Sequence, residues 1–358
     1  MYNSALEILN IIENKGFKAY IVGGFVRDYY MKIDSCDIDI CTNALPVDLI
    51  DIFPNAILPK EKYGAVIIYY KNIKFEITTF RKELKYINRK PVEIEYIDNL
   101  KEDIFRRDFT INSICIDKFG NVIDYFNGIS DINNKIIRCL GDIDTKLKDD
   151  PLRILRAIRF ATVLNFRLES TLKSKIKEYS YLLKNISYDR KKSELDKIFS
   201  SVNVFYGISL LKDIQNELDI NLDNVKITKD ILGIWAQIDM GCYNFTKNEK
   251  NIIDSIRKIV NNNTISKIDL YNYGLYIVLI ASSILEISKD VINVLDKSLN
   301  IRNRSDINIS TNEIIDILKI EPGKWINDIY TDLEEKIISN KLKNENEIIK
   351  DYIIKKYC

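Results

Sequence analysis

The sequence contains no histidine, and this absence excludes several kinds of chemistry. Ser-His-Asp and Cys-His catalysis need an imidazole, as do zinc sites built on histidine ligands and metal-dependent phosphohydrolases of the HD type. The six cysteines do not replace it, because they lie scattered along the chain and form no CxxC pair. Any catalysis must therefore use carboxylates, lysine, arginine and metal ions bound by oxygen.

Long apolar runs and a large net charge are also missing. The longest apolar stretch, residues 273–287, has about 15 residues, fewer than the roughly 20 needed to cross a bilayer. The chain starts with a polar, amphipathic segment rather than a signal peptide. It carries 53 Lys and Arg against 52 Asp and Glu, so overall charge identifies no polyanionic partner. With cysteines typical of a reducing compartment, these features predict a cytoplasmic protein without a membrane partner.

The hydrophobic pattern changes near residue 140. Before it, short apolar and β-branched segments alternate with short helices, whereas helical periodicity dominates after it. The expected strands are 19–22, 38–41, 65–70, 73–79, 92–96 and 114–116, with a hairpin turn at Asn72 between two of them. Segment 141–200 is the most basic, with 14 Lys and Arg against 9 Asp and Glu. We predict an α+β fold with a head (1–140), a helical neck (141–200), a helical body (201–295) and a helical tail (296–358).

The first motif is GGFVRD at residues 23–28, directly after the strand predicted at 19–22. Glycines at the entry to a helix let backbone N–H groups approach a phosphate closely, and Arg27 adds positive charge beside them. Gly24 and Arg27 are therefore candidates for binding a phosphate. The alternative for a Gly-Gly pair alone is an ordinary turn from strand to helix.

The second motif is the DID sequence at residues 37–39. Residues two apart on a strand project to the same face, so Asp37 and Asp39 point together and repel each other unless a cation lies between them. Mg²⁺ held by one or two carboxylates and by substrate phosphates suits this arrangement. Such an ion activates an attacking hydroxyl and neutralises a leaving pyrophosphate. The alternative is the solvated face of an edge strand.

Five motifs occur in one order over about 140 residues: GGFVRD, DID, FEITTFR (75–81), RRDFTIN (106–112) and DDPLRILRAIRF (149–160). This order resembles the class II tRNA nucleotidyltransferases and the bacterial poly(A) polymerases. The resemblance implies a polymerase β-type nucleotidyltransferase head, a mixed sheet with helices, followed by an all-α neck, body and tail. It also implies that Asp37 and Asp39 are the catalytic Mg²⁺ ligands, with Gly24 and Arg27 at the nucleotide. Glu76 is either a third carboxylate ligand or an exposed strand residue.

The RRD sequence at 106–108 places a guanidinium beside a carboxylate. Together they can hold a ribose hydroxyl and a phosphate, which would favour NTPs over dNTPs. The resemblance assigns Arg107 to the nucleotide, with Asp108 and Asn112 nearby. The alternative is a surface ion pair.

The stretch from Asp149 is predicted to form a helix that opens at Asp150 and Pro151, an ordinary N-cap and first turn. Asp150 and Arg153 are three residues apart, so both can reach one planar ligand. A carboxylate accepts from the amino group of cytosine or adenine, whereas guanine and uracil present a carbonyl there. We therefore expect this pair to select C and A without a template. Arg156 and Arg159 continue the basic stripe and are expected at the triphosphate.

The length of one loop and four later segments indicate which nucleotides the enzyme adds. Relatives that add only the two cytidines have a shorter loop than the 24 residues between Arg81 and Arg106, which include residues 86–91. The segments at 188–199, 306–310, 319–325 and 340–344 resemble the neck and tail of CCA-adding enzymes of the Bacillus type without an HD domain. The expected activity is addition of C, C and A to the tRNA 3′ end from CTP and ATP, with release of pyrophosphate. An A-adding enzyme or a poly(A) polymerase is the alternative. We expect tRNA along the basic neck, with Lys191 and Lys192 at its phosphates.

Overall fold

The computed structural model describes residues 1–35, 37–59, 64–87 and 90–358. Cys36 and residues 88–89 of the predicted loop lie outside the described residues. The chain forms two compact units, Met1–Asp219 and Ile220–Cys358. The first unit is α+β and the second is helical, as the sequence predicted. The four-part division into head, neck, body and tail remains a prediction.

A mixed six-stranded sheet lies in the first unit, in the order β3-β4-β2-β1-β7-β8. Its strands are β1 (Ala19–Val22), β2 (Ile38–Thr42), β3 (Ala65–Tyr70), β4 (Ile73–Thr79), β7 (Cys115–Ile116) and β8 (Val122–Ile123). Strands β2 and β4 are parallel, and the other neighbours are antiparallel. The predicted turn at Asn72 is confirmed, since Lys71 and Asn72 both have positive φ, as a tight hairpin turn between β3 and β4 requires.

Short helices flank the sheet and connect its strands. They are α1 (Tyr2–Glu13), α2 (Gly24–Tyr30), α3 (Pro46–Ile52), α4 (Leu100–Phe105), the 3₁₀ turn η1 (Thr110–Asn112) and α5 (Gly128–Asn133). Val22, Cys41 and Phe80 are fully buried in a core cluster that also includes Leu100 and Ile104 of α4. This core holds the C-terminal parts of β1 and β2 against α4.

The stretch between Arg81 and Arg106 is largely a hairpin rather than a loop. Strands β5 (Arg81–Ile87) and β6 (Lys90–Tyr96) pair antiparallel in a separate two-stranded sheet. The sequence predicted only the end of β6. Strand β5 reads RKELKYI, and its charged residues give no sign of the buried face that identifies a strand in a pattern.

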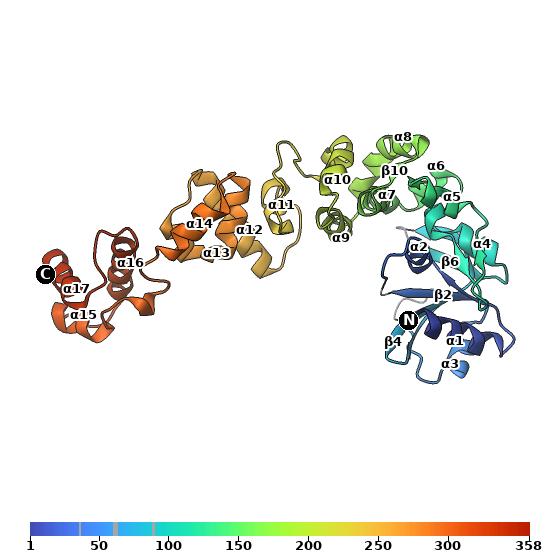
Figure 1. Cartoon of the computed structure of the whole chain (residues 1–358), viewed down its shortest axis with the longest axis horizontal. Helices are drawn as coiled ribbons and strands as arrows, with labels where there is room; N and C mark the ends of the chain where they lie inside the picture. The colour runs from blue at the N-terminus through green and yellow to red at the C-terminus, as the bar shows by residue number, and fades with distance from the viewer. Residues whose placement is uncertain (36, 60–63, 88–89) are drawn as a thin grey trace. The chain divides into compact units, whose positions relative to one another are not determined.

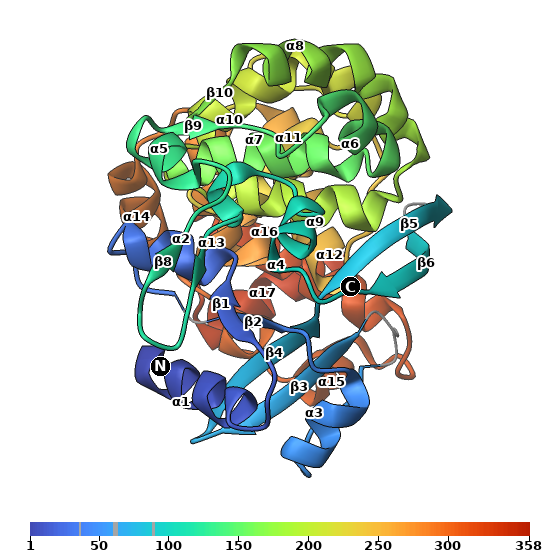
Figure 2. The ribbon, with the colours of Figure 1, turned by 90° about the vertical axis from the view of Figure 1, so that its right-hand side faces the viewer.

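Helices make up the rest of the first unit. They are α6 (Ile143–Asp149), α7 (Leu152–Leu164), α8 (Ser170–Tyr179), η2 (Ser180–Asn185), α9 (Tyr188–Phe199), α10 (Val204–Leu211) and η3 (Lys212–Leu218). A short parallel pair, β9 (Ile136–Ile137) and β10 (Arg167–Leu168), joins them to the preceding segment. Within this unit, α7 to α10 lie at one end and α1 and α3 at the other, with the sheet between them (Figures 1 and 2).

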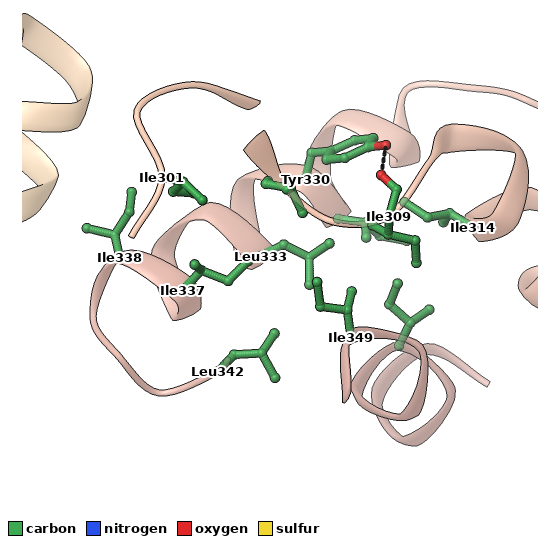
Figure 3. Packing of buried hydrophobic residues seen from close by; sticks show 12 residues of the cluster. Ile301, Ile309, Ile314, Tyr330, Leu333, Ile337, Ile338, Leu342 and Ile349 are labelled. Carbon is green, nitrogen blue, oxygen red and sulfur yellow. Dashed lines mark hydrogen bonds between the residues drawn. The ribbon is translucent and has the colours of Figure 1, made fainter. Parts of the chain in front are cut away.

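The second unit consists of helices, several of which have side-chain caps at their N-termini. They are α11 (Ile231–Ile238), α12 (Lys247–Asn262), α13 (Lys267–Ile284), α14 (Lys289–Lys297), η4 (Arg304–Asp306), α15 (Thr311–Leu318), α16 (Trp325–Ile338) and α17 (Asn346–Tyr357). Capping boxes start α12, α13 and α15. A core of isoleucines and leucines joins α15, α16 and α17, and Tyr330 donates to the Ile309 carbonyl at its edge (Figure 3).

Two further expectations can be compared with the structure. In the part of the chain that is described, no helix combines the length and the apolar character needed to cross a bilayer. The five described cysteines are all free thiols, three of them buried.

Candidate active site

A cavity of about 890 Å³ in the first unit brings all ten predicted site residues together. They are Asp37, Asp39, Gly24, Arg27, Arg107, Asp108, Asp150, Arg153, Arg156 and Arg159. They come from the β1–α2 turn, the start of β2, the segment before η1, and α7 with the residues just before it. Segments far apart in the sequence therefore meet around one space, large enough for a nucleotide.

The carboxylate pair lies at the start of β2. Asp39 is the second residue of the strand, and Asp37 stands one residue before the strand begins. Burial, with a contribution from the nearby Glu76 and Asp37, raises the pKa of Asp39, although Arg107 opposes the shift. Two adjacent carboxylates, one of them partly withdrawn from water, form a set of oxygen donors that a hard cation would stabilise.

Glu76 lies on the neighbouring strand β4, directly paired with Asp39 in the parallel register. Its side chain is exposed and is not part of the cavity lining. Among the residues that the structure describes, no group of three or more Asp, Glu, Cys or His side chains is placed to hold a metal ion. The structure therefore brings the two predicted metal ligands together, with Glu76 on the neighbouring strand.

Gly23 determines how closely the turn after β1 approaches these groups. Its φ is +83°, and a Cβ there would lie 3.2 Å from Oδ2 of Asp39 and 3.3 Å from Nη1 of Arg107. Only glycine meets both conditions without strain. The predicted site included Gly24 but not Gly23, although the Gly-Gly pair contained the signal.

Arg107 lies against this turn. Burial alone would lower the pKa of its guanidinium, but acidic groups around it, Asp39 and Asp103 among them, raise it overall. The Arg107 Nε atom is buried, and no hydrogen-bond acceptor for it exists among the described residues. A buried donor without an acceptor is uncommon in a folded protein.

Asp108 has a protein partner that the sequence did not reveal. Its Oδ2 accepts from Nε of Arg156 at 2.8 Å, and its Oδ1 accepts from the Phe109 amide and from Asn112. Burial by itself raises the pKa of Asp108, but the Arg156 charge and these hydrogen bonds outweigh it and lower the pKa to about 2. The Asp108 carboxylate is thus held ionised at the cavity wall, directly after Arg107 in the sequence.

The three arginines of α7 line the cavity, each with its own partner. Arg153 donates from Nη1 to the Lys146 carbonyl at 2.8 Å, and Arg156 is paired with Asp108. Arg159 lies 3.2 Å from Oε2 of Glu194 on α9. The predicted basic stripe is therefore present, and its charges are already oriented before any ligand binds.

Asp150 also lines the cavity and has a structural role. Helix α7 begins at Leu152, one residue later than predicted, with Pro151 already in helical conformation. The Asp150 Oδ1 accepts from the Leu152 amide at 3.2 Å, which is the capping function that the sequence offered as the alternative. Capping and base selection are compatible, because one carboxylate accepts several hydrogen bonds.

Several residues at the cavity were not predicted. Arg81, Glu83 and Arg106 form an ion-pair network at its wall, with Arg81 Nη2 3.0 Å from Glu83 Oε1. Phe160 also lines the cavity. Its position four residues after Arg156 was a readable signal, since such residues share one face of a helix.

The prediction that Lys191 contacts tRNA is wrong. Its side chain is 1% exposed, with Nζ 4.1 Å from the ring centre of Tyr188 and 3.9 Å from Oδ2 of Asp219. A phosphate in solution cannot reach it. Lys192 is partly exposed and pairs with Asp196 at 2.8 Å. Lys197, on the same helix, is exposed and lies at the cavity rim.

Three segments match known protein families. Residues 19–138 match the poly A polymerase head domain, and residues 165–215 match the family described as a probable RNA and SrmB-binding site of polymerase A. Residues 243–353 match tRNA nucleotidyltransferase domain 2. The first match contains Asp37, Asp39 and the RRD segment.

Solved structures share the fold over almost the whole chain. The Bacillus stearothermophilus CCA-adding enzyme in complex with CTP has a TM-score of 0.83 at 23% identity, covering 99% of this chain and 97% of that one. The Thermotoga maritima CCA-adding enzyme complexed with tRNA has a TM-score of 0.73 at 21% identity, covering 99% and 95%.

Curated relatives are more similar in sequence. The CCA-adding enzyme of Staphylococcus haemolyticus is 32% identical, over 99% of this chain and 97% of the relative. That of Streptococcus agalactiae is 31% identical, over 98% and 96%. Such similarity along nearly the full length of both proteins means that the chain belongs to the CCA-adding enzymes, the tRNA nucleotidyltransferases that add C, C and A to tRNA 3′ ends.

Proposed function

We propose that the cavity of this CCA-adding enzyme is its active site, and that each residue around it has a separate task. The 3′ hydroxyl of tRNA attacks the α-phosphate of CTP or ATP, the bond to the β-phosphate breaks, and pyrophosphate leaves. The observation that carries the proposal is the convergence of the Asp37–Asp39 pair, the α7 arginines and Asp150 on one cavity. Family membership supports the reaction, and the geometry supports the assignment of the residues.

Asp37 and Asp39 would hold Mg²⁺. The donor set fits, because both ligands are carboxylates and Asp39 is a partly buried one whose pKa is raised by burial beside its acidic neighbours. When bound, the ion would activate the attacking hydroxyl and neutralise charge on the departing pyrophosphate. Glu76 remains a candidate third ligand, since it pairs with Asp39 in the sheet.

Arginines would position the triphosphate and the ribose. Arg27, Arg156 and Arg159 face the cavity with their guanidinium groups held by carboxylates or amides, so little reorganisation is needed when phosphates arrive. Arg107 lines the cavity, with its Nη1 atom beside the Gly23 turn, so its charge would lie close to a bound phosphate. Asp108 keeps Arg156 oriented and is the nearby carboxylate for a ribose hydroxyl.

Asp150 and Arg153 would read the base. An Asp150 oxygen accepts from the amino group that cytosine and adenine share, and Arg153 donates to the neighbouring ring acceptor. Uracil and guanine would present a carbonyl to the carboxylate, leaving two acceptors face to face. This explains how two side chains choose CTP and ATP without a template strand.

The cellular setting follows from the substrate. A tRNA substrate and free, partly buried thiols support a cytoplasmic enzyme.

The carboxylate assignment is tested by replacing each aspartate with asparagine, which keeps the shape and removes the charge. Asp37→Asn and Asp39→Asn should reduce incorporation of labelled CTP into tRNA to the detection limit, with tRNA affinity little changed in a filter-binding assay. Asp34→Asn is the matched control, because Asp34 is exposed on the same segment and does not line the cavity. Near-normal turnover in Asp37→Asn would contradict the assignment.

A further inference from the structure

Three guanidinium groups surround the ring of Phe160 in the cavity. The central carbon of Arg159 lies 4.2 Å from the ring centre, that of Arg27 lies 5.2 Å away and that of Arg156 lies 5.6 Å away. Arg27 comes from α2, which follows β1, whereas Arg156 and Arg159 precede Phe160 on α7. One aromatic ring therefore contacts cations from two separate elements.

The Phe160 ring can offset the mutual repulsion of the three arginine side chains. Three like charges converge on one cavity, and each is paired with a carboxylate: Arg27 with Asp28, Arg156 with Asp108, and Arg159 with Glu194. The negative face of an aromatic ring attracts cations within about 6 Å of its centre, and such contacts strengthen away from water. An aliphatic side chain of similar size would fill the same space without this attraction.

A second aromatic ring, that of Phe109, packs against Phe160. Phe109 is fully buried and contacts Phe160 edge to face, with 5.7 Å between ring centres and 78° between planes. The Phe109 amide donates to Asp108, and Asn112 links Asp108 to Arg27. The orientation of Phe160 is thus tied to the same network that holds two of the three arginines.

We propose that Phe160 is a positioning residue for the triphosphate, which sets the directions of Arg27, Arg156 and Arg159 without touching the reacting atoms. The inference rests on the proposed assignment of these arginines to the triphosphate. It goes further by naming the group that orients them. A side chain acting in this way affects the binding of phosphates rather than of the base.

The test is the affinity of the full-length protein for CTP, CDP and CMP without tRNA, measured by calorimetry. Phe160→Leu should weaken CTP binding about tenfold, CDP binding less, and CMP binding hardly at all, because the loss follows the number of phosphates. Phe160→Tyr keeps the ring and should restore CTP affinity to within about twofold. The CTP to UTP preference should not change in either variant.

Phe166→Leu is the matched control. Phe166 is buried just after α7 and does not line the cavity, whereas Phe160 is half-buried, so Phe166→Leu loses at least as much aromatic packing but should leave the CTP to CMP affinity ratio unchanged. An equal loss for all three nucleotides in Phe160→Leu, or no loss at all, would overturn the inference.

A separate variant distinguishes this failure from failure of the proposed function. Arg159→Gln should weaken CTP binding if the arginine serves the triphosphate. If Arg159→Gln weakens CTP binding and Phe160→Leu does not, only the role of Phe160 is wrong. If Arg159→Gln also leaves CTP affinity unchanged, the triphosphate assignment itself is contradicted.

Discussion

The ion pair between Asp108 and Arg156 should contribute to stability as well as to the active site, and Asp108→Asn removes it. The pKa of Asp108 is lowered from 3.8 to about 2 in the folded chain. At 1.36 kcal/mol per pKa unit, this corresponds to about 2.5 kcal/mol of unfolding free energy. Fully buried pairs can lose about 3–5 kcal/mol when one partner is removed, but Arg156 is one-third exposed and can still be hydrated. We therefore expect Asp108→Asn to lower the free energy of unfolding by about 2.5 kcal/mol.

The pH dependence of this effect has a definite sign. Because the folded pKa lies below the ordinary value, the ionised carboxylate stabilises the fold fully above about pH 4, and this contribution is lost as the pH falls towards 2. The amide that replaces the carboxyl group in Asp108→Asn cannot titrate, so the variant lacks this component. The stability difference between wild type and Asp108→Asn should be constant from pH 7 to about pH 5 and should shrink progressively between pH 4 and pH 2.

Urea unfolding of the full-length protein measures this difference. The two tryptophans, Trp235 and Trp325, both lie in the second unit, so their fluorescence follows that unit, whereas far-ultraviolet circular dichroism follows both. The variant should shift the dichroism transition of the first unit and leave the tryptophan transition unchanged. Analysing the two transitions separately avoids treating a chain of two units as a single two-state system.

Asp98→Asn is the control for this experiment. Asp98 pairs with Lys18 at 3.0 Å, but both side chains are more than half exposed, so its removal should not change stability measurably. The reasoning is refuted if Asp108→Asn is as stable as wild type at pH 7. It is equally refuted if the difference between them does not change between pH 4 and pH 2.

Three further predictions concern substrate binding. Asp150→Ala should relax discrimination against UTP and GTP in single-nucleotide incorporation assays; a variant that loses only about 1 kcal/mol of stability and keeps its selectivity would show that Asp150 is merely a helix cap. Gly23→Ala should slow incorporation, because φ +83° with ψ −143° is a backbone conformation that costs other residues roughly 1–3 kcal/mol, and because the added Cβ would crowd Asp39 and Arg107. Unchanged turnover would mean that the turn relaxes freely. Lys197→Gln should make the fall of log tRNA affinity with log salt concentration less steep, by about 0.7–0.9 in the slope, without altering nucleotide preference. An unchanged slope would place the RNA elsewhere.

The sequence predicted those parts of the fold that depend on local pattern. Strands β1, β3 and β4 begin and end at the residues predicted from their runs of apolar, aromatic and β-branched side chains. The site residues could be found because they lie in short motifs that a strand end, a glycine turn or a helix start presents together. Strand β5 was missed because its RKELKYI sequence has no sustained alternation of apolar and polar residues, and its pairing partner β6 lies in the same separate two-stranded sheet.

The partners of the site residues could not be predicted, because they depend on packing between distant segments. Nothing in the RRD motif indicates that Asp108 meets Arg156, and nothing in α7 indicates that Arg159 meets Glu194. Lys191 is different, since its burial could have been read from the sequence. The buried residues of α9 are Lys191, Glu194, Leu195, Ile198 and Phe199, and this spacing is that of a core-facing helix stripe.

The most direct test of the central claim is the product formed by the wild-type protein on tRNA that lacks its last three nucleotides. With CTP alone the product should grow by two nucleotides, and with CTP and ATP together by three, and then stop. ATP, UTP or GTP supplied alone should add nothing to this substrate. Extended A tails from ATP alone, or incorporation of UTP at a rate similar to that of CTP, would contradict the account.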